Sequence, residues 1–155
     1  MIQRIQSVWL FLATLVLILM IFLPLATKVT DGSEWIIYTS GSHQNMPAQD
    51  AKVLKAEVFV PLLAANIVLI LLCFVNIFNF KRRSAQKKVA IFTILAIIGF
   101  AFWCSLYAKE LPGGIEGASF GVGAYLPAVA ILFIVLAIFG INKDERLIRS
   151  AERLR

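Results

Sequence analysis

The sequence is poor in residues that carry acid–base or metal chemistry. Of its 155 residues only 15% are charged, one is a histidine and two are cysteines. No charged residue and no histidine falls inside the four longest apolar stretches. Ion-coupled transporters, proton relays and intramembrane metalloproteases need ionisable groups at membrane depth. The sequence therefore argues against all three.

The single histidine, His43, lies in a polar segment with scattered carboxylates. Paired with Asp31, Glu34 or Asp50, it could act as a general acid or as a metal ligand. Metal sites need clustered ligands, however, so a solvated surface side chain is the favoured interpretation. A serine hydrolase needs a histidine beside its serine. Ser105 lies in an apolar stretch without one, and we read it as a helix-packing hydroxyl. We expect no catalytic residue, no metal and no cofactor.

The two cysteines, Cys73 and Cys104, belong to different apolar stretches and to different expected depths. At 1.5 Å per residue, Cys73 lies about 11 Å, and Cys104 about 23 Å, from the polar loop that joins their helices. This offset exceeds the roughly 7 Å between Cα atoms that a disulfide allows. We predict two free, buried thiols.

Hydrophobic residues, by contrast, are abundant, at 60% of the chain, and the mean hydropathy is +0.85. An apolar helix needs about 20 residues to cross roughly 30 Å of hydrocarbon. The sequence predicts an all-α membrane protein, an antiparallel bundle of four transmembrane helices in a single domain. The helices are expected at residues 5–27, 58–80, 89–108 and 118–142. Between and after them lie an outer loop (28–57), a cytoplasmic loop (81–88), a second outer loop (109–117) and a cytoplasmic tail (143–155).

Positive charge is concentrated in the short loop between the second and third apolar stretches. We expect this group to anchor the topology, and it consists of Lys81, Arg82, Arg83, Lys87 and Lys88. Eleven of the 15 basic residues fall on the same side as this loop and both termini. Cytoplasmic loops carry the excess of Lys and Arg, so both termini are predicted to face the cytoplasm. Topology then explains the net charge of +6, and the charge does not indicate a nucleic-acid partner. Anionic lipid headgroups remain an alternative partner of the loop.

The first outer loop contains the only sizeable polar segment. Residues 33–39 are β-branched and aromatic between glycines and predict a strand. Residues 41–47 read as a turn, and the chain from Ala48 onward reads as a helix that continues into the second span. The loop at 109–116 could supply another strand. Such strands beside four helices suggest a weakly claudin-like arrangement, although the paired loop cysteines of that fold are missing.

Small and amide residues indicate how the helices pack. Asn66 and Asn76 are expected to hydrogen-bond to neighbouring helices, with mutual locking favoured over a polar path. Gly117 and Gly121 share the four-residue spacing of a close-packing surface. They lack the Gly-Lys-Ser/Thr continuation of a phosphate loop.

The tail combines an apolar stripe with basic residues, as a short helix on the inner leaflet would. A topology signal needs no such pattern, so the tail is our candidate contact for lipid headgroups, for the N-terminal Ile2/Ile5 face or for a partner protein. Its candidate contact residues are Leu147, Ile148, Ala151, Leu154, Arg146, Arg149 and Arg153.

Three segments carry a resemblance to a known family: Met1-Ile-Gln-Arg-Ile-Gln6, Tyr125-Leu-Pro127 and the closing stretch from Gly140 to Arg155. The chain resembles an uncharacterised (domain-of-unknown-function) family of small four-helix inner-membrane proteins of Bacteroidota. The resemblance spans the whole chain. It implies a Gram-negative inner membrane and supplies no catalytic residues.

The sequence leaves three functions open. The leading expectation is a non-catalytic accessory or scaffold subunit that contacts a larger inner-membrane assembly through its transmembrane faces and basic tail. The alternative is a binder or carrier of a lipid or other apolar small molecule within the bundle. The third is a membrane enzyme that uses the outer loop.

Overall fold

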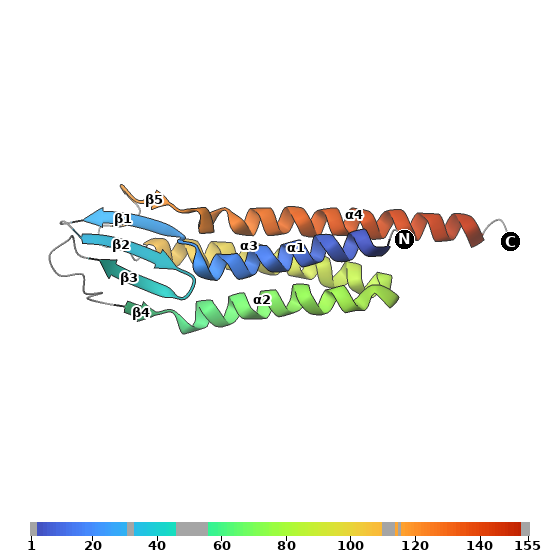
Figure 1. The fold of residues 1–155 in the computed structure, drawn as a ribbon, viewed down its shortest axis with the longest axis horizontal. Coiled ribbons are helices and arrows are strands. Elements are labelled where there is room, and N and C mark those ends of the chain that lie inside the picture. The colour runs from blue at the N-terminus through green and yellow to red at the C-terminus, as the bar shows by residue number, and fades with distance from the viewer. Residues whose placement is uncertain (1–2, 31–32, 46–55, 110–113, 115, 153–155) are drawn as a thin grey trace.

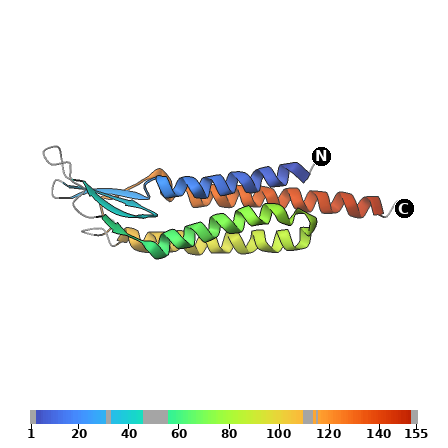
Figure 2. The ribbon, with the colours of Figure 1, turned by 60° about the horizontal axis from the view of Figure 1, so that its bottom comes forward.

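The computed structural model describes residues 3–30, 33–45, 56–109, 114 and 116–152. Four long helices lie side by side, and a sheet covers one end of them (Figures 1 and 2). We call this end the sheet end. Both chain termini and the α2–α3 connection lie at the opposite end, the termini end. The helices are α1 (Gln3–Phe22), α2 (Val60–Phe78), α3 (Arg83–Lys109) and α4 (Leu126–Glu152).

All four helices are long and apolar enough to cross a membrane. Helix α1 packs against α4 and α2, and α3 closes the bundle by packing against α2 and α4. Each helix contributes fully buried aliphatic side chains to the core, among them Leu17, Leu62, Ile97 and Ile134. Large apolar side chains also cover the outward faces, as in a bundle surrounded by lipid. The predicted four-helix architecture is confirmed.

Within the described residues the sheet has five strands, each antiparallel to its neighbours, in the order β4-β3-β2-β1-β5. Strand β5 comes from the segment before α4, so the sheet joins two distant parts of the chain. The strands are β1 (Ala26–Thr30), β2 (Ser33–Tyr38), β3 (Gly41–Asn45), β4 (Ala56–Val58) and β5 (Ser119–Phe120).

The strand predicted at 33–39 is confirmed, but its surroundings differ from the prediction. Residues 41–45, expected to form a turn, are strand β3. The edge of β2 supplies backbone hydrogen-bond partners to this polar segment, and local sequence propensity does not include such partners. Ala56–Val58 is a strand where a helix was expected, and residues 48–55 lie outside the described residues. Most of the segment 109–116, which could have supplied a strand, lies outside the described residues. Strand β5 (Ser119–Phe120) falls instead within the predicted fourth helix.

The helix bounds differ from the prediction at both ends of the bundle. Helix α3 begins at Arg83 instead of residue 89, so most of the expected loop at 81–88 is helical. The first and fourth helices are shorter at the sheet end than predicted. Helix α1 ends at Phe22 instead of continuing to Thr27, because Pro24 has no N–H to donate to a helix. Helix α4 begins at Leu126 instead of residue 118, after the short 3₁₀ helix η2 (Val122–Ala124).

Gly117 and Gly121 consequently do not pack one helix against another. Gly117 has φ +76° in a turn, and Gly121 is extended. A Cβ atom at Gly121 would collide with the backbone of Pro24, and the Gly121 N–H donates to the carbonyl of Leu25 at 3.0 Å. The close approach therefore joins the segment before α4 to the chain that leaves α1.

The end of α1 and the chain that leaves it are hydrogen-bonded to the β2–β3 turn, to β2 and to η2. The last carbonyls of a helix have no partner within it and are costly to leave bare in an apolar setting. The hydroxyl of Thr39, a fully buried side chain, donates to the carbonyl of Met20 at 3.0 Å. The N–H of Gly123 donates to the carbonyl of Pro24 at 2.9 Å, and that of Leu25 to the carbonyl of Ile37 at 2.7 Å.

Replacing the Thr39 hydroxyl by a methyl group should destabilise the junction between α1 and the sheet. We expect Thr39→Val to lower the free energy of unfolding by about 1–3 kcal/mol, because the buried Met20 carbonyl loses its donor. The measurement is reversible unfolding in detergent followed by tryptophan fluorescence. The matched control is Ser40→Ala, which removes a neighbouring hydroxyl that is only partly buried. Equal stabilities of the two variants would contradict the assignment.

Candidate functional site

Polar side chains gather at the termini end of the bundle. The Nε2 group of Gln6, on α1, donates to Oδ2 of Asp144, on α4, and both residues are buried. Gly140 lies one turn before Asp144, and a Cβ atom there would be 2.9 Å from Cγ of Gln6. Glycine at position 140 therefore makes the space in which Gln6 reaches the carboxylate.

A second polar contact joins α3 to α4 at the same end. The ammonium of Lys87 donates to Oδ1 of Asn142 at 2.8 Å. Two adjoining pockets of about 320 and 580 Å³ share Asn142 and Arg146. The other described lining residues are Lys87 and Glu145 in the first pocket, and Phe139, Lys143 and Ser150 in the second.

Asn76, predicted to pack helices together, hydrogen-bonds to α3. Its side chain Nδ2 donates to the carbonyl of Gln86, and Nε2 of Gln86 donates to the carbonyl of Asn76, each at 3.3 Å. This reciprocal pair fixes α2 against α3 across the connection η1 (Asn79–Lys81).

The expected topology anchor is half-buried at Arg83 and Lys87 and exposed at Arg82 and Lys88, while the side chain of Lys81 lies outside the described residues.

Asn66 behaves differently from Asn76. It is fully buried in α2, but neither atom of its amide has a hydrogen-bond partner among the described residues. The predicted interhelical hydrogen bond is therefore not present. A buried amide without partners costs about 1–3 kcal/mol.

An apolar pocket of about 320 Å³ lies between α3 and α4 at the sheet end. Among its described lining residues, only Ser105 and Tyr125 bring polar side-chain oxygens to it, and the Ser105 hydroxyl already donates to the carbonyl of Phe102 at 2.7 Å. Its lining comprises Met20, Leu25, Ala101, Cys104, Ser105, Ala108, Phe120, Ala124, Tyr125 and Pro127. Cys104 and Cys73 are both buried and free, as predicted.

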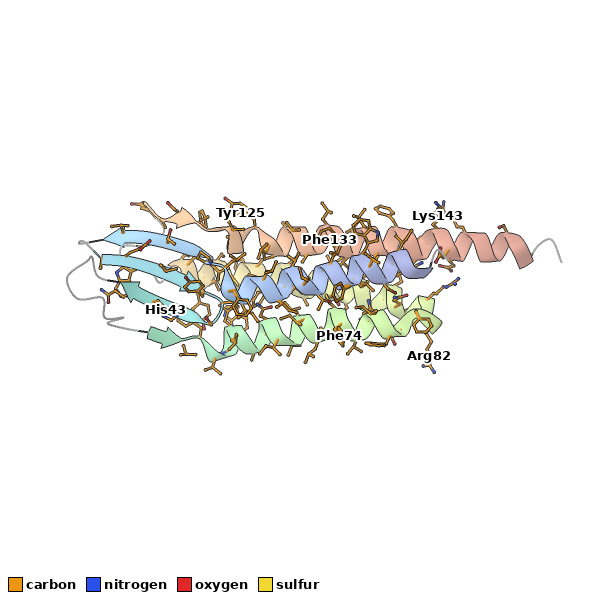
Figure 3. The ribbon with its side chains drawn as sticks, viewed as in Figure 1. His43, Phe74, Arg82, Tyr125, Phe133 and Lys143 are labelled. Atoms are coloured by element: carbon orange, nitrogen blue, oxygen red, sulfur yellow. The ribbon has the colours of Figure 1, made fainter. Side chains whose placement is uncertain are left out.

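His43 lies on strand β3, at the opposite end of the molecule from Arg82 and Lys143 (Figure 3). Its ring contacts that of Tyr38, with centroids 5.5 Å apart. Glu34 lies on the neighbouring strand, exposed, whereas Asp31 and Asp50 lie outside the described residues. The described part of the chain contains no group of three His, Cys, Asp or Glu residues that could hold a metal ion.

The tail continues α4 without a break. The helix runs to Glu152 and extends past the ends of the other three helices (Figure 1). The short helix expected to lie flat on the membrane surface would need a bend near residue 143, and α4 has none. Within the predicted contact group only Arg146 has a described side chain, and it is exposed. The side chains of Leu147, Ile148, Arg149 and Ala151, and the whole of Arg153 and Leu154, lie outside the described residues.

Sequence reasoning missed the polar contacts at the termini end. Gln6 reads as part of the polar side of the first helix, and Asp144 reads as one more charge in the tail. One sequence signal pointed to this contact. Gly140 and Asp144 are four residues apart and so share a face of their helix. A neighbouring helix could approach closely at the glycine and place a polar side chain beside the carboxylate. Which helix occupies that position depends on the packing alone.

These features define a class of protein: a sheet-capped bundle of four helices, each long and apolar enough to cross a membrane. The chain belongs to the domain-of-unknown-function family DUF4293, whose model matches residues 2–154. The resemblance to an uncharacterised family is thereby confirmed, and the bacterial group stays a prediction. A comparison with curated proteins finds none that matches the chain.

The Gln6–Asp144 contact can be tested by a double-mutant cycle. Gln6→Leu should lower the free energy of unfolding by about 1–3 kcal/mol, because a buried carboxylate loses its donor. The double variant Gln6→Leu/Asp144→Leu should regain part of this loss, since no buried polar group is then left unpaired. Thermal unfolding in detergent gives the stabilities. The exposed neighbour, in the variant Lys143→Met, serves as the control. Strict additivity of the two changes would contradict the contact.

Proposed function

We propose that the protein is a non-catalytic accessory or scaffold subunit of a larger inner-membrane assembly. Its termini and the basic segment at 81–88, which includes the first turns of α3, then face the cytoplasm; this agrees with the excess of Lys and Arg in those parts of the chain. It contacts the assembly through its transmembrane faces and its basic tail.

The observation that carries this proposal is the extension of α4. Asp144 lies beside the first turns of α1, and Glu152 is eight residues farther on, which is about 12 Å along the helix axis. Short helices without tertiary contacts are marginal in water. A basic, projecting helix is therefore a suitable element for docking a partner. The Gln6–Asp144 and Lys87–Asn142 contacts fix its direction at the base.

A second observation concerns the lipid-facing side of α3. Gly99 is exposed in the middle of this helix, and a Cβ atom there would meet nothing within 4 Å. Glycine in a helix interior costs about 0.5–1 kcal/mol relative to alanine. Nothing in the described fold needs its small size. A neighbouring transmembrane helix would use it, because small residues let two helices approach closely in a membrane.

A large side chain at position 99 should weaken association with the partner without affecting the folding of the protein. We expect Gly99→Phe to fold normally, since its side chain points into open space, but to lose most of the partner that co-purifies with the wild-type protein. Removing two tail charges, in Arg149→Gln/Arg153→Gln, should weaken the same association. The measurement is quantitative mass spectrometry of the tagged full-length protein, extracted from its native membrane in mild detergent.

The matched control is Leu71→Phe, which adds an aromatic ring to the exposed face of α2. This variant should retain the partner. A wild-type protein that is strictly monomeric, with nothing co-purifying, would contradict the proposed function.

The apolar pocket at the sheet end supports a second candidate function, the binding of a lipid or other apolar small molecule. Its volume of about 320 Å³ falls at the lower end of the roughly 300–1,000 Å³ found for small-molecule sites. Buried apolar lining with one or two polar groups is also typical of such sites. The pocket lies where α3 meets η2 and the first turn of α4.

Filling this pocket tests the second candidate. Ala108→Phe places a ring in the pocket and should remove any apolar molecule that native mass spectrometry finds bound to the wild-type protein. Leu106→Phe, on the exposed side of the same helix, should leave binding unchanged. An empty wild-type pocket, or equal binding by both variants, would rule the candidate out.

A further inference from the structure

At the termini end, two adjoining pockets form a recess that combines basic and apolar side chains. The smaller pocket lies between α3 and α4, and the described lining of the larger one comes from α4. Lys87 on α3 and Arg146 on α4 line the smaller pocket, and Lys143 joins Arg146 in the adjoining one. Among the described lining residues, Glu145 is the single acid. The carboxylate of Asp144 accepts from Gln6 on α1. The recess therefore carries net positive charge.

The geometry holds the cationic groups in position. An ammonium has three N–H donors. One donor of Lys87 goes to Oδ1 of Asn142 at 2.8 Å, and this contact ties the side chain to the seam. Arg146 lies one turn after Asn142 on the same face of α4 and can present two parallel N–H groups to an anion. The two cations thus approach the pocket from opposite helices.

The recess becomes apolar toward the middle of the bundle. Phe139 lines the larger pocket two turns before Arg146, about 10 Å away along α4, and it is exposed. Ile91 follows Lys87 by one turn on α3 and is also exposed. A ligand that fits both parts has an anionic head and a hydrocarbon tail, with the head at the end of the apolar span.

We propose that this recess binds the phosphate group of an anionic phospholipid, with the acyl chains lying along α3 and α4 beside Ile91 and Phe139. Basic pockets between transmembrane helices at the membrane surface are known sites for such headgroups. Volumes of about 320 and 580 Å³ suit a headgroup with its glycerol. The site shares Arg146 with the proposed docking tail, but lipid binding there needs no partner protein.

The test uses the full-length protein in dodecyl maltoside and native mass spectrometry. Phosphatidylglycerol, phosphatidylcholine with the same acyl chains, and inorganic phosphate are titrated separately. We expect saturable binding of phosphatidylglycerol about tenfold tighter than that of phosphatidylcholine. Inorganic phosphate should neither bind comparably nor displace the lipid, because it lacks the acyl chains that contact the apolar part.

Matched charge variants locate the site. Lys87→Gln/Arg146→Gln should reduce the preference for phosphatidylglycerol to near that for phosphatidylcholine. Arg82→Gln/Lys88→Gln removes the same charge from exposed positions in the neighbouring segment and should keep the preference. Arg146→Glu alone leaves the Lys87–Asn142 contact in place, so its loss of preference would report the site and not a folding defect.

Three results would overturn the inference. An equal loss of the preference for phosphatidylglycerol in the pocket variant and in the control variant would indicate general electrostatic attraction to the protein surface. Equal binding of the two lipids by the wild-type protein would remove the role of the cations. Comparable binding of inorganic phosphate would indicate a site for a free anion. None of these results bears on the proposed docking function, which is read from protein partners.

Discussion

Backbone hydrogen bonding in an apolar setting is the constraint on which this structure depends. Within a helix the backbone N–H and C=O groups bond to one another. The groups at each helix end need partners elsewhere, because water is not available at membrane depth. At the end of α1 the Thr39 hydroxyl donates to the carbonyl of Met20, and just beyond the helix the Gly123 N–H donates to the carbonyl of Pro24; the two donors come from different connections. The sheet is the consequence, because it brings both loops to the same helix end and pairs their remaining backbone groups.

The seam between α3 and α4 is where the bundle leaves space. Helix α1 packs along α4 with Gln6 seated at Gly140, and α2 is tied to α3 by the Asn76–Gln86 pair. Along the seam between α3 and α4, one pocket lies at the sheet end and another at the termini end. The pocket at the sheet end is apolar, and the recess at the termini end is basic. The contrast follows from position, since charged side chains are tolerated where a span ends and not along its length.

The candidate site was only partly predictable from the sequence. Lys87 and Arg146 both belong to groups that the sequence marks as functional or topological, because basic residues at the ends of apolar stretches stand out by themselves. Their partner Asn142 does not stand out, since an amide at a helix end has many ordinary roles. Asn66 and Asn76 look alike in the sequence and differ in the structure. Only Asn76 lies opposite Gln86, and the turn at the end of α2 decides that position.

The sequence by itself determined the four helices and the ends at which charge collects, because length and apolar composition are properties of each segment alone. It also contains the reason for the early end of the first helix, Pro24, although the predicted span at 5–27 ran past that residue. The tertiary structure alone decided the strand at Gly41–Asn45, the contact of Gln6 with Asp144 and the pockets between α3 and α4. Each of these depends on which distant segment lies alongside, and neither composition nor periodicity carries that information.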